Sequence, residues 1–194
     1  MDQVKLERRA AMATLLAGRD ENLLVIPGLG STAWDAAAAG DNDRNFYLWG
    51  AMGGVAMIGL GLALAQPKQR VAVITGDGEM LMGLGSLATI GIQQPRNLAV
   101  IVFDNGLYGE TGMQPSHTQS GVDLVAAAGA CGIATCLDVR DADALSDLAQ
   151  RLRTLDGTLF ARVRIAAEEP PRVLPLRDGV ALKERFRAAL GIRA

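Results

Sequence analysis

The chain has 194 residues, of which 49% are hydrophobic and 4% aromatic, and its formal net charge is −2. This length and apolar content suit one domain, residues 1–194, with one hydrophobic core. Because the chain lacks basic stripes and stacking aromatic patterns, we do not expect it to bind nucleic acid.

The first part of the chain predicts a helix, a strand and a second helix. We expect a helix over residues 3–17 and a buried strand over residues 22–26. The loop over residues 27–32 then opens a second helix, with Ser31 or Thr32 as its N-cap. Acidic residues near the start, with no long apolar core after them, argue against a secretion signal, so we expect a cytoplasmic protein.

A glycine-rich run from residue 50 to residue 65 carries no charge. We expect its second part, residues 55–65, to be a core helix, because apolar residues at helical spacing usually pack. A membrane-spanning helix needs about twenty mainly apolar residues, and this run is shorter and rich in glycine. We therefore predict no membrane association.

Two short runs rich in β-branched residues, 71–75 and 98–103, have the pattern of buried strands. Each is followed by a polar motif: Gly76-Asp77-Gly78-Glu79 after the first, and Asp104-Asn105-Gly106-Leu107-Tyr108-Gly109 after the second. A helix from Met80 to about Gln93 is expected between them. Because the carboxyl ends of parallel strands meet at the ligand-binding edge of an α/β sheet, the two motifs should lie together there.

Asp77 and Asn105 carry the chemistry of this edge. Their side-chain oxygens suit a hard cation such as Mg²⁺, which binds a few protein oxygens together with those of a phosphate. The glycines beside them allow a phosphate to approach backbone N–H groups. A lone Gly-Asp-Gly is usually only a turn, so the prediction of a metal and diphosphate site depends on both motifs.

The remaining elements complete an α/β pattern. We expect a helix over residues 121–131, a strand over 134–139, a helix over 141–155 capped by Asp141, and a strand over 159–165. Alternating strands and helices predict a single doubly wound α/β domain with a mainly parallel sheet of about five or six strands.

The C-terminal extension, residues 168–194, contains three prolines before a basic helix that starts near Gly179. We expect it to leave the sheet and pack on a neighbour or on the surface. Cys131 and Cys136 lack the spacing of a zinc or redox motif, so we expect buried free thiols.

The paired motifs, with Asp77 and Asn105 28 positions apart (105 − 77), resemble the signature of thiamine diphosphate enzymes. In that signature, Gly-Asp-Gly and an Asn-Asn or Asp-Asn hold Mg²⁺ and the coenzyme diphosphate. The run Gly50-Ala51-Met52-Gly53 resembles the turn that these enzymes place beside the pyrimidine ring. Residues 45–118 are similar to the β subunit or C-terminal half of sulfopyruvate and phosphonopyruvate decarboxylases. The resemblance thus implies a thiamine diphosphate-binding fold.

The resemblance also implies a set of ligands. It places Asp77, Asn105 and the Leu107 carbonyl on Mg²⁺. On the pyrimidine side, the Gly50 carbonyl would accept from the aminopyrimidine, and Met52 would wedge beneath the rings. Around the coenzyme it further places Gly30, Ser31, Gly76, Gly78, the Glu79 backbone, Tyr108 and Gly109. For Gly30 and Ser31, a simple capped turn is an equally good interpretation.

Three residues near the motifs have open roles. Glu79 and Glu110 depart from the family pattern, in which small or hydroxyl residues are usual, and the two carboxylates weigh against a phosphonate or sulfonate substrate. His117 is the only histidine. It is either a solvated surface residue or a group that transfers a proton or contacts the substrate carboxylate.

Enzymes of this family need a second α/β module, which presents an activating glutamate to the pyrimidine ring. No second series of strands and helices is visible in the sequence. We therefore expect a separate pyrimidine-module (α) subunit, an α2β2 or larger assembly, and thiamine diphosphate-dependent decarboxylation of a 2-oxo acid.

Other functions stay open. A thiamine diphosphate-dependent carboligase or aldehyde-transferring lyase would share every residue named above. A 2-oxo acid ferredoxin oxidoreductase subunit is disfavoured, because two cysteines cannot ligate an iron–sulfur cluster in the usual four-thiolate way. A non-catalytic nucleotide-binding module is a further alternative, although no Gly-x-Gly-x-x-Gly turn follows the first strand.

Overall fold

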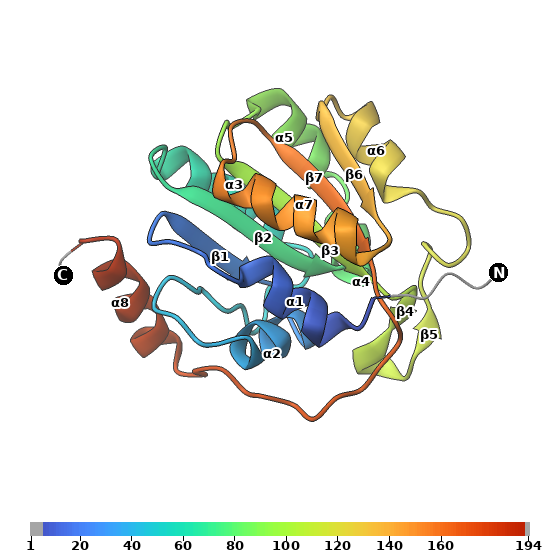
Figure 1. Ribbon diagram of the computed structural model, residues 1–194, viewed down its shortest axis with the longest axis horizontal. Helices are drawn as coiled ribbons and strands as arrows, with labels where there is room; N and C mark the ends of the chain where they lie inside the picture. The colour runs from blue at the N-terminus through green and yellow to red at the C-terminus, as the bar shows by residue number, and fades with distance from the viewer. Residues whose placement is uncertain (1–5, 193–194) are drawn as a thin grey trace.

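The computed structural model describes residues 6–192 and is built around one parallel β-sheet (Figure 1). Five strands pair in the order β1-β2-β3-β7-β6, and all four pairings are parallel. The strands are β1 (Leu23–Pro27), β2 (Arg70–Gly76), β3 (Leu98–Asp104), β6 (Thr135–Val139) and β7 (Leu159–Arg164). A parallel sheet was predicted, and its five strands are confirmed with boundaries that differ by one residue at most.

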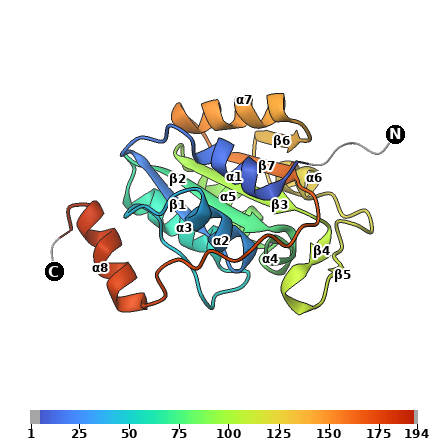
Figure 2. The same ribbon diagram turned by 60° about the horizontal axis from the view of Figure 1, so that its bottom comes forward.

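Helices cover both faces of the sheet (Figures 1 and 2). One face carries α1 (Arg8–Leu16), α2 (Ser31–Ala38) and α7 (Ala142–Arg153). The other carries α3 (Val55–Ala65), α4 (Asp77–Met82), α5 (Ser86–Gln93) and α6 (Leu124–Ala130). The predicted doubly wound α/β domain is therefore confirmed.

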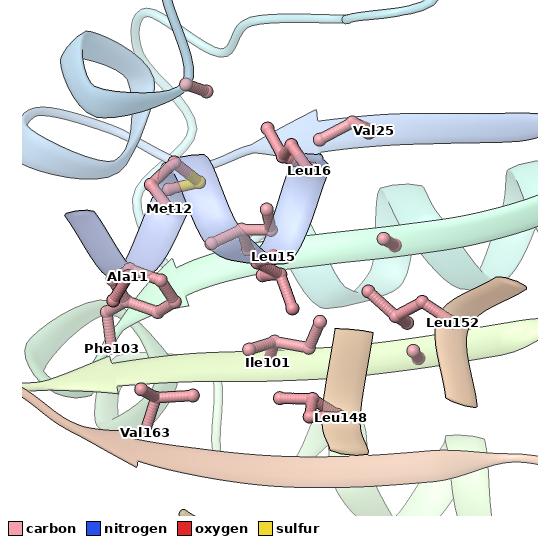
Figure 3. Packing of buried hydrophobic residues seen from close by; sticks show 14 of the residues in the cluster. Ala11, Met12, Leu15, Leu16, Val25, Ile101, Phe103, Leu148, Leu152 and Val163 are labelled. Atoms are coloured by element: carbon pink, nitrogen blue, oxygen red, sulfur yellow. The ribbon is translucent and has the colours of Figure 1, made fainter. Parts of the chain in front are cut away.

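Side chains of the central strands alternate between the two helical layers, as the two-residue period of a strand requires. Ile101 and Phe103 of β3 face the α1 and α7 side, whereas Val100 and Val102 face the α3 and α5 side. Figure 3 shows Ile101 beneath α1 and α7. Because both faces are buried, the strands are nearly continuous apolar runs, and this pattern made them recognisable in the sequence.

Several helix boundaries differ from the predictions. The predicted helix over residues 3–17 begins at Arg8, because Leu6 is extended and bridges to Ile165 beside β7; residues 3–5 lie outside the described residues. The helix predicted from residue 121 begins at Leu124, where the Asp123 side chain accepts from the backbone N–H groups of the first turn.

The N-cap prediction for α2 was wrong. Gly30 precedes the helix with a φ of 65°, and neither Ser31 nor Thr32 caps it. The hydroxyl of Thr32 instead donates to the Leu29 carbonyl over 3.2 Å. By contrast, Asp141 caps α7 as predicted, because its side chain accepts from the Ala144 N–H.

The single helix predicted between Met80 and Gln93 is two helices. α4 ends at Met82, α5 begins at Ser86, and Gly83 is the C-cap between them. A Cβ atom on Gly83 would lie only 2.2 Å from the Gly53 carbonyl oxygen. The break therefore coincides with a close approach of two backbone segments.

The tail after β7 packs on the domain itself. The Trp49 indole donates to the Leu176 carbonyl over 3.1 Å, and the guanidinium of Arg172 stacks 4.4 Å from the centre of the Trp34 ring. The tail ends in α8 (Gly179–Ala189), which was predicted to start near Gly179 and whose Phe186 ring contacts Phe46. Contact of residues 168–194 with a neighbouring chain stays a prediction.

The cysteines and the apolar helices bear on two further predictions. Cys131 and Cys136 are free thiols, as predicted, but both are only partly buried, whereas burial was expected. Within the described part of the chain, no helix combines the length and the apolar character needed to cross a membrane.

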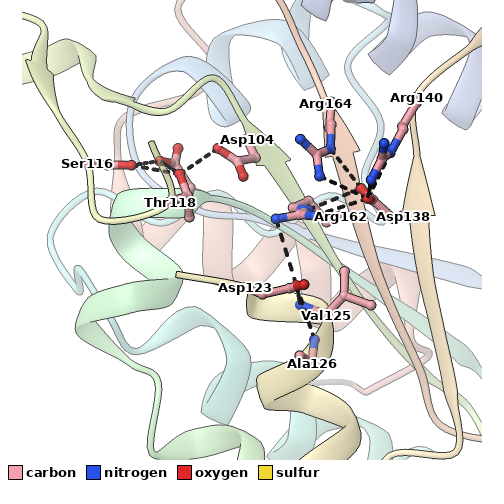
Figure 4. Close-up of polar contacts among 11 residues, drawn as sticks. Asp104, Ser116, Thr118, Asp123, Val125, Ala126, Asp138, Arg140, Arg162 and Arg164 are labelled. Carbon is pink, nitrogen blue, oxygen red and sulfur yellow. Dashed lines mark hydrogen bonds and ion pairs between the residues drawn. The ribbon is translucent and has the colours of Figure 1, made fainter. Parts of the chain in front are cut away.

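Asp138 of β6 joins the last two strands of the sheet through three arginines (Figure 4). Its carboxylate accepts from Arg162 and Arg164 of β7 over 3.0 Å and from Arg140. Partial burial alone would raise the pKa of Asp138, but hydrogen bonds from Arg164, Arg162 and Arg140 hold this pKa well below its ordinary value.

We expect Asp138→Asn to lower the free energy of unfolding at pH 7 by about 1–2 kcal/mol, a value kept small because solvent screens a partly exposed cluster. A carboxyl whose pKa is depressed on folding stabilises the fold above its unfolded pKa of about 3.9, and this contribution is lost as the pH falls. Urea unfolding of the variant and the unmodified chain at pH 7, 5 and 3 checks this. A difference between their free energies of unfolding that does not shrink at pH 3 would contradict it.

Candidate functional site

A cavity of about 400 Å³ lies at the carboxyl ends of β2 and β3. Its walls come chiefly from the loop after β1, the start of α4, the loop after β3, and the tail after β7. This is the edge at which open α/β sheets bind ligands, and the glycines there expose backbone N–H groups.

Most residues predicted for the site line this cavity. Those that do are Ser31, Met52, Gly76, Asp77, Gly78, Glu79, Asn105, Leu107, Tyr108 and Gly109. Gly30, Gly50 and His117 do not line it. Gly30 adjoins it through Glu110, because a Cβ atom on Gly30 would lie 2.6 Å from the Glu110 carboxylate.

Asp77 is the first residue of α4 and is only 2% exposed. The Ser116 hydroxyl donates to its Oδ2, and the Thr118 hydroxyl lies 3.1 Å from the same oxygen and 2.9 Å from Asp104 Oδ1 (Figure 4). Burial, together with the charge of Asp104, raises the pKa of Asp77 to about 6 despite these hydrogen bonds. Thr118 thus lies between the carboxylates of Asp77 and Asp104, and no lysine or arginine of the described residues forms a hydrogen bond with either of them. Such a pair of carboxylates suits a site for a divalent cation.

The loop after β3 folds back as a small hairpin. Gly106 adopts a φ of 76°, the Asn105 Oδ1 accepts from the Leu107 N–H over 2.8 Å, and β4 (Leu107–Tyr108) pairs with β5 (Gln114–Pro115) around a short 3₁₀ turn. The hairpin returns Ser116 and Thr118 to Asp77. These two hydroxyls were not predicted, because they lie 39 and 41 positions from Asp77; the polar run after the motif was the available signal.

Gly78 permits a close contact that forms one wall of the cavity. A Cβ atom there would lie 2.5 Å from the ring of Tyr108. Because the tyrosine ring occupies the place of a side chain, the start of α4 and the loop after β3 approach each other closely. Glycine is thus required at this position for packing as well as for backbone exposure.

Glu79 does not point freely into the cavity. It is 6% exposed, and its Oε2 accepts from the Thr75 hydroxyl over 2.8 Å. Burial raises the pKa of Glu79, and the hydrogen bond from Thr75, together with the nearby backbone N–H groups of Leu29 and Gly53, opposes that increase. The side chain lies against Gly28 of the loop after β1, and the expectation that this carboxylate stands beside the bound anions stays a prediction.

Other carboxylates do reach the cavity. Glu110 lines it, as do Glu168 and Glu169 of the tail, which the sequence did not suggest as site residues. Arg8 and Arg172 also line it, but Arg8 pairs with the buried Asp35 at 3.0 Å. The tail residues were missed because nothing local in the sequence shows that the chain returns across this edge of the sheet.

His117 is exposed, and its Nδ1 lies 3.1 Å from the Tyr108 hydroxyl. Tyr108 lines the cavity, so the imidazole is one side chain removed from it. A role for His117 in proton transfer or substrate contact stays a prediction.

The donor set limits which metal could bind. Within residues 6–192, no three His, Cys, Asp or Glu side chains gather as a complete metal site. A cation beside Asp77 would need further oxygens from amide or carbonyl groups and from a ligand. Mg²⁺ with a diphosphate is chemically compatible with this arrangement, because Mg²⁺ usually binds one or two carboxylates plus phosphate oxygens.

Comparison with known proteins relates this site to one family. Residues 30–163 match the family described as "Thiamine pyrophosphate enzyme, C-terminal TPP binding domain". The chain belongs to this family. The matched range includes both polar motifs, so the part of the cavity at the carboxyl ends of β2 and β3 lies within the thiamine pyrophosphate (thiamine diphosphate) binding domain.

Relatives of known name agree with that assignment. The chain is 40% identical over 158 residues to "Phosphonopyruvate decarboxylase" from Streptomyces viridochromogenes, a match that covers 81% of this chain and 39% of the relative. It is 39% identical over 160 residues to "Sulfopyruvate decarboxylase subunit beta" from Methanothermobacter thermautotrophicus, with 82% of each chain covered. The corresponding subunit from Methanocaldococcus jannaschii is 42% identical over 59% of this chain and 61% of its own.

Solved structures show the same fold. Benzoylformate decarboxylase from Polynucleobacter necessarius superposes with a TM-score of 0.70 at 21% identity, over 86% of this chain and 34% of that one. A putative thiamin diphosphate-dependent enzyme from Mycobacterium smegmatis gives a TM-score of 0.71 at 20% identity, over 84% and 32%. This chain therefore spans about a third of the length of these structures and 39% of the phosphonopyruvate decarboxylase.

Proposed function

We propose that the chain is the Mg²⁺- and diphosphate-binding subunit of a heteromeric thiamine diphosphate-dependent 2-oxo acid decarboxylase. The observation that carries the proposal is the position of Asp77. It is buried at the end of β2, in one cavity with Asn105 and Leu107 of the loop after β3. The names of the phosphonopyruvate and sulfopyruvate decarboxylases among the relatives support the decarboxylase class.

The residues of this chain would bind and orient the coenzyme. Asp77, the Asn105 side chain and the Leu107 carbonyl would hold Mg²⁺ against the diphosphate. Backbone groups at the starts of α2 and α4 and in the loop after β3 would surround the phosphates, at Gly30, Ser31, Gly76, Gly78, Glu79, Tyr108 and Gly109. Met52 and Gly50 would contact the pyrimidine end. When bound, the coenzyme supplies the nucleophilic carbon and the electron sink for loss of carbon dioxide.

A separate subunit would complete the site. Three relatives that this chain matches are named as β subunits, and the phosphonopyruvate decarboxylase has a large part that this chain does not match. We propose that a pyrimidine-module (α) subunit corresponds to that part and that the active assembly is an α2β2 or larger hetero-oligomer.

The surface of α3, α4 and α5 suits such a partner. Residues 46–67 and 80–95 contain no charged residue, yet Met57 is 42% exposed and Met82 is 67% exposed. Uncharged, exposed apolar faces mark interfaces. Met52 lines the cavity and is also 44% exposed, so a partner seated on this face would cover the cavity rim as well.

A charge on this face should prevent assembly. We expect Met82→Asp to weaken binding of the α subunit by at least about tenfold, because an unpaired carboxylate would be buried at the interface. The melting temperature of the chain alone should change little, since the side chain is exposed. The matched control is Gln150→Asp on the exposed side of α7. Size-exclusion chromatography of the α subunit mixed with each variant measures complex formation. Equal complex formation by Met82→Asp and Gln150→Asp would contradict the proposed surface.

Reconstitution tests the function. The chain should be purified with the product of its neighbouring gene and supplied with thiamine diphosphate and Mg²⁺. Release of carbon dioxide from a panel that includes pyruvate, sulfopyruvate and phosphonopyruvate is expected only from the complex. Activity of the chain alone would refute the shared site. Measuring whether a hydroxy ketone forms when an acceptor aldehyde is added separates carboligation from simple decarboxylation, because both reactions release carbon dioxide.

A further inference from the structure

The Glu79 side chain connects three segments around the cavity. It starts from α4, its Oε2 accepts from Thr75 at the end of β2, and it fills the space beside Gly28 in the loop after β1. A Cβ atom on Gly28 would lie only 1.9 Å from the Glu79 Oε2. The glycine at position 28 therefore makes room for this carboxyl group.

Two backbone segments direct N–H groups toward the carboxyl group. These belong to Leu29, in the loop after β1, and to Gly53, in the turn before α3. Oε1 is fully enclosed, and no hydrogen-bond partner for it lies within bonding distance among the described residues. The two segments are the ones that carry Ser31 and Met52, and both of these residues line the cavity.

Filling this space with a carboxyl group has a high desolvation cost. Burying a carboxylate costs several kcal/mol more than burying an apolar side chain of equal size, unless its oxygens receive hydrogen bonds. An apolar side chain could not accept from Thr75 or attract the two backbone N–H groups. The arrangement is accounted for if the carboxyl group fixes the positions of the two segments.

We propose that Glu79 is a positioning residue: its carboxyl group holds the loop over residues 28–31 and the turn over residues 50–54 at the spacing that the coenzyme requires. The benefit of this positioning for coenzyme binding rests on the proposed function. The connection between the segments is a property of the coenzyme-free chain and is measurable without the coenzyme.

Four variants of the full chain test the proposal: Glu79→Ala, Glu79→Gln, Gly28→Ala and the double variant Gly28→Ala/Glu79→Ala. Glutamine retains an oxygen for the backbone N–H groups and an amide that can donate to the Thr75 hydroxyl. Alanine at position 28 displaces the carboxyl group without removing it. Melting temperatures show whether each variant is folded.

Hydrogen–deuterium exchange of the coenzyme-free chain is the first measurement. In Glu79→Ala and Gly28→Ala, amides in residues 28–31 and 50–54 should exchange about tenfold faster or more, the equivalent of losing one hydrogen bond to a charged group. Peptides from α7 serve as the internal control. Unchanged exchange in both segments would overturn the proposal.

Binding of Mg²⁺ and thiamine diphosphate is the second measurement. Tryptophan fluorescence reports it, because Trp34 lines the cavity. Glu79→Ala and Gly28→Ala should each bind about tenfold more weakly, and Glu79→Gln should stay within about threefold of the unmodified chain. The double variant should bind no more weakly than Glu79→Ala, because Gly28→Ala acts by displacing the carboxyl group.

The outcomes separate the two proposals. Additive effects in the double variant, or a Glu79→Gln variant as weak as Glu79→Ala, would overturn the positioning role while the proposed function stands. If the unmodified chain and its complex fail to bind the coenzyme, the proposed function fails, and the exchange measurement still decides whether Glu79 connects the two segments.

Discussion

Replacing Asp77 with Asn should abolish coenzyme binding and at the same time raise the melting temperature of the coenzyme-free chain. Binding of Mg²⁺ with thiamine diphosphate should weaken by at least about a hundredfold, since changes to outer-shell partners alone reduce metal affinity by 10–100-fold. The amide keeps the shape of the side chain but removes the charge that would hold Mg²⁺.

The gain in stability follows from the same charge. Asp77 is buried near Asp104, and its pKa is raised to about 6. A carboxyl whose pKa rises on folding destabilises the fold at pH values above that range, so Asp77→Asn should add about 2 kcal/mol to the free energy of unfolding at pH 8. The gain should fade as the pH falls through the folded pKa of about 6, and it should be lost below the unfolded pKa of about 3.9, where the carboxyl group is protonated in both states.

Calorimetric titration and urea unfolding at pH 8 and pH 5 measure the two effects. Asp147→Asn is the control for a lost negative charge, because Asp147 is exposed on α7 and pairs only with Arg151; its effect should be within about 0.5 kcal/mol. Coenzyme binding by Asp77→Asn at the affinity of the unmodified chain would remove Asp77 from the metal site.

Gly83→Ala should destabilise the chain by about 2–3 kcal/mol, although it exchanges glycine for a better helix former. The added Cβ atom would lie 2.2 Å from the Gly53 carbonyl oxygen, and that atom is backbone that cannot rotate away. The turn before α3 or the end of α4 must therefore shift. Because Met52 lies in this turn and lines the cavity, coenzyme binding should weaken as well.

Gly85→Ala is the matched control, two positions further along. Nothing lies within 4 Å of a Cβ atom there, and the backbone is in the right-handed helical region with a φ of −60°. This substitution should stabilise the chain by about 0.5 kcal/mol through the unfolded state. Equal free energies of unfolding for the two variants would show that the contact between Gly53 and Gly83 has no energetic role.

The strands and the main motifs could be predicted from the sequence because their signals are local. The runs before Gly76 and Asp104 are apolar and β-branched, and a parallel sheet buried on both faces needs that composition. The polar residues that follow each run must then lie at one sheet edge. Asp77 and Asn105 were placed in one cavity by this reasoning, and the structure confirms that both line it.

The features that were missed depend on contacts distant in the sequence. The break between α4 and α5 comes from the approach of Gly83 to Gly53, and helical periodicity across Met80 to Gln93 gives no sign of it. Ser116 and Thr118 reach Asp77 only through the hairpin after β3. The contact between the Glu79 carboxyl group and Gly28 was likewise not predicted, because it depends on the position of the loop after β1.

The charge-free outer side of α3, α4 and α5 has a consequence for how the chain can change over evolutionary time. On the outer side of α7, where Asp147 and Gln150 face water, exchanges between polar residues are nearly neutral. Around Met57 and Met82, a polar exchange would have to fit the surface of the proposed α subunit, so under that proposal accepted changes there should arise in matched pairs across two genes.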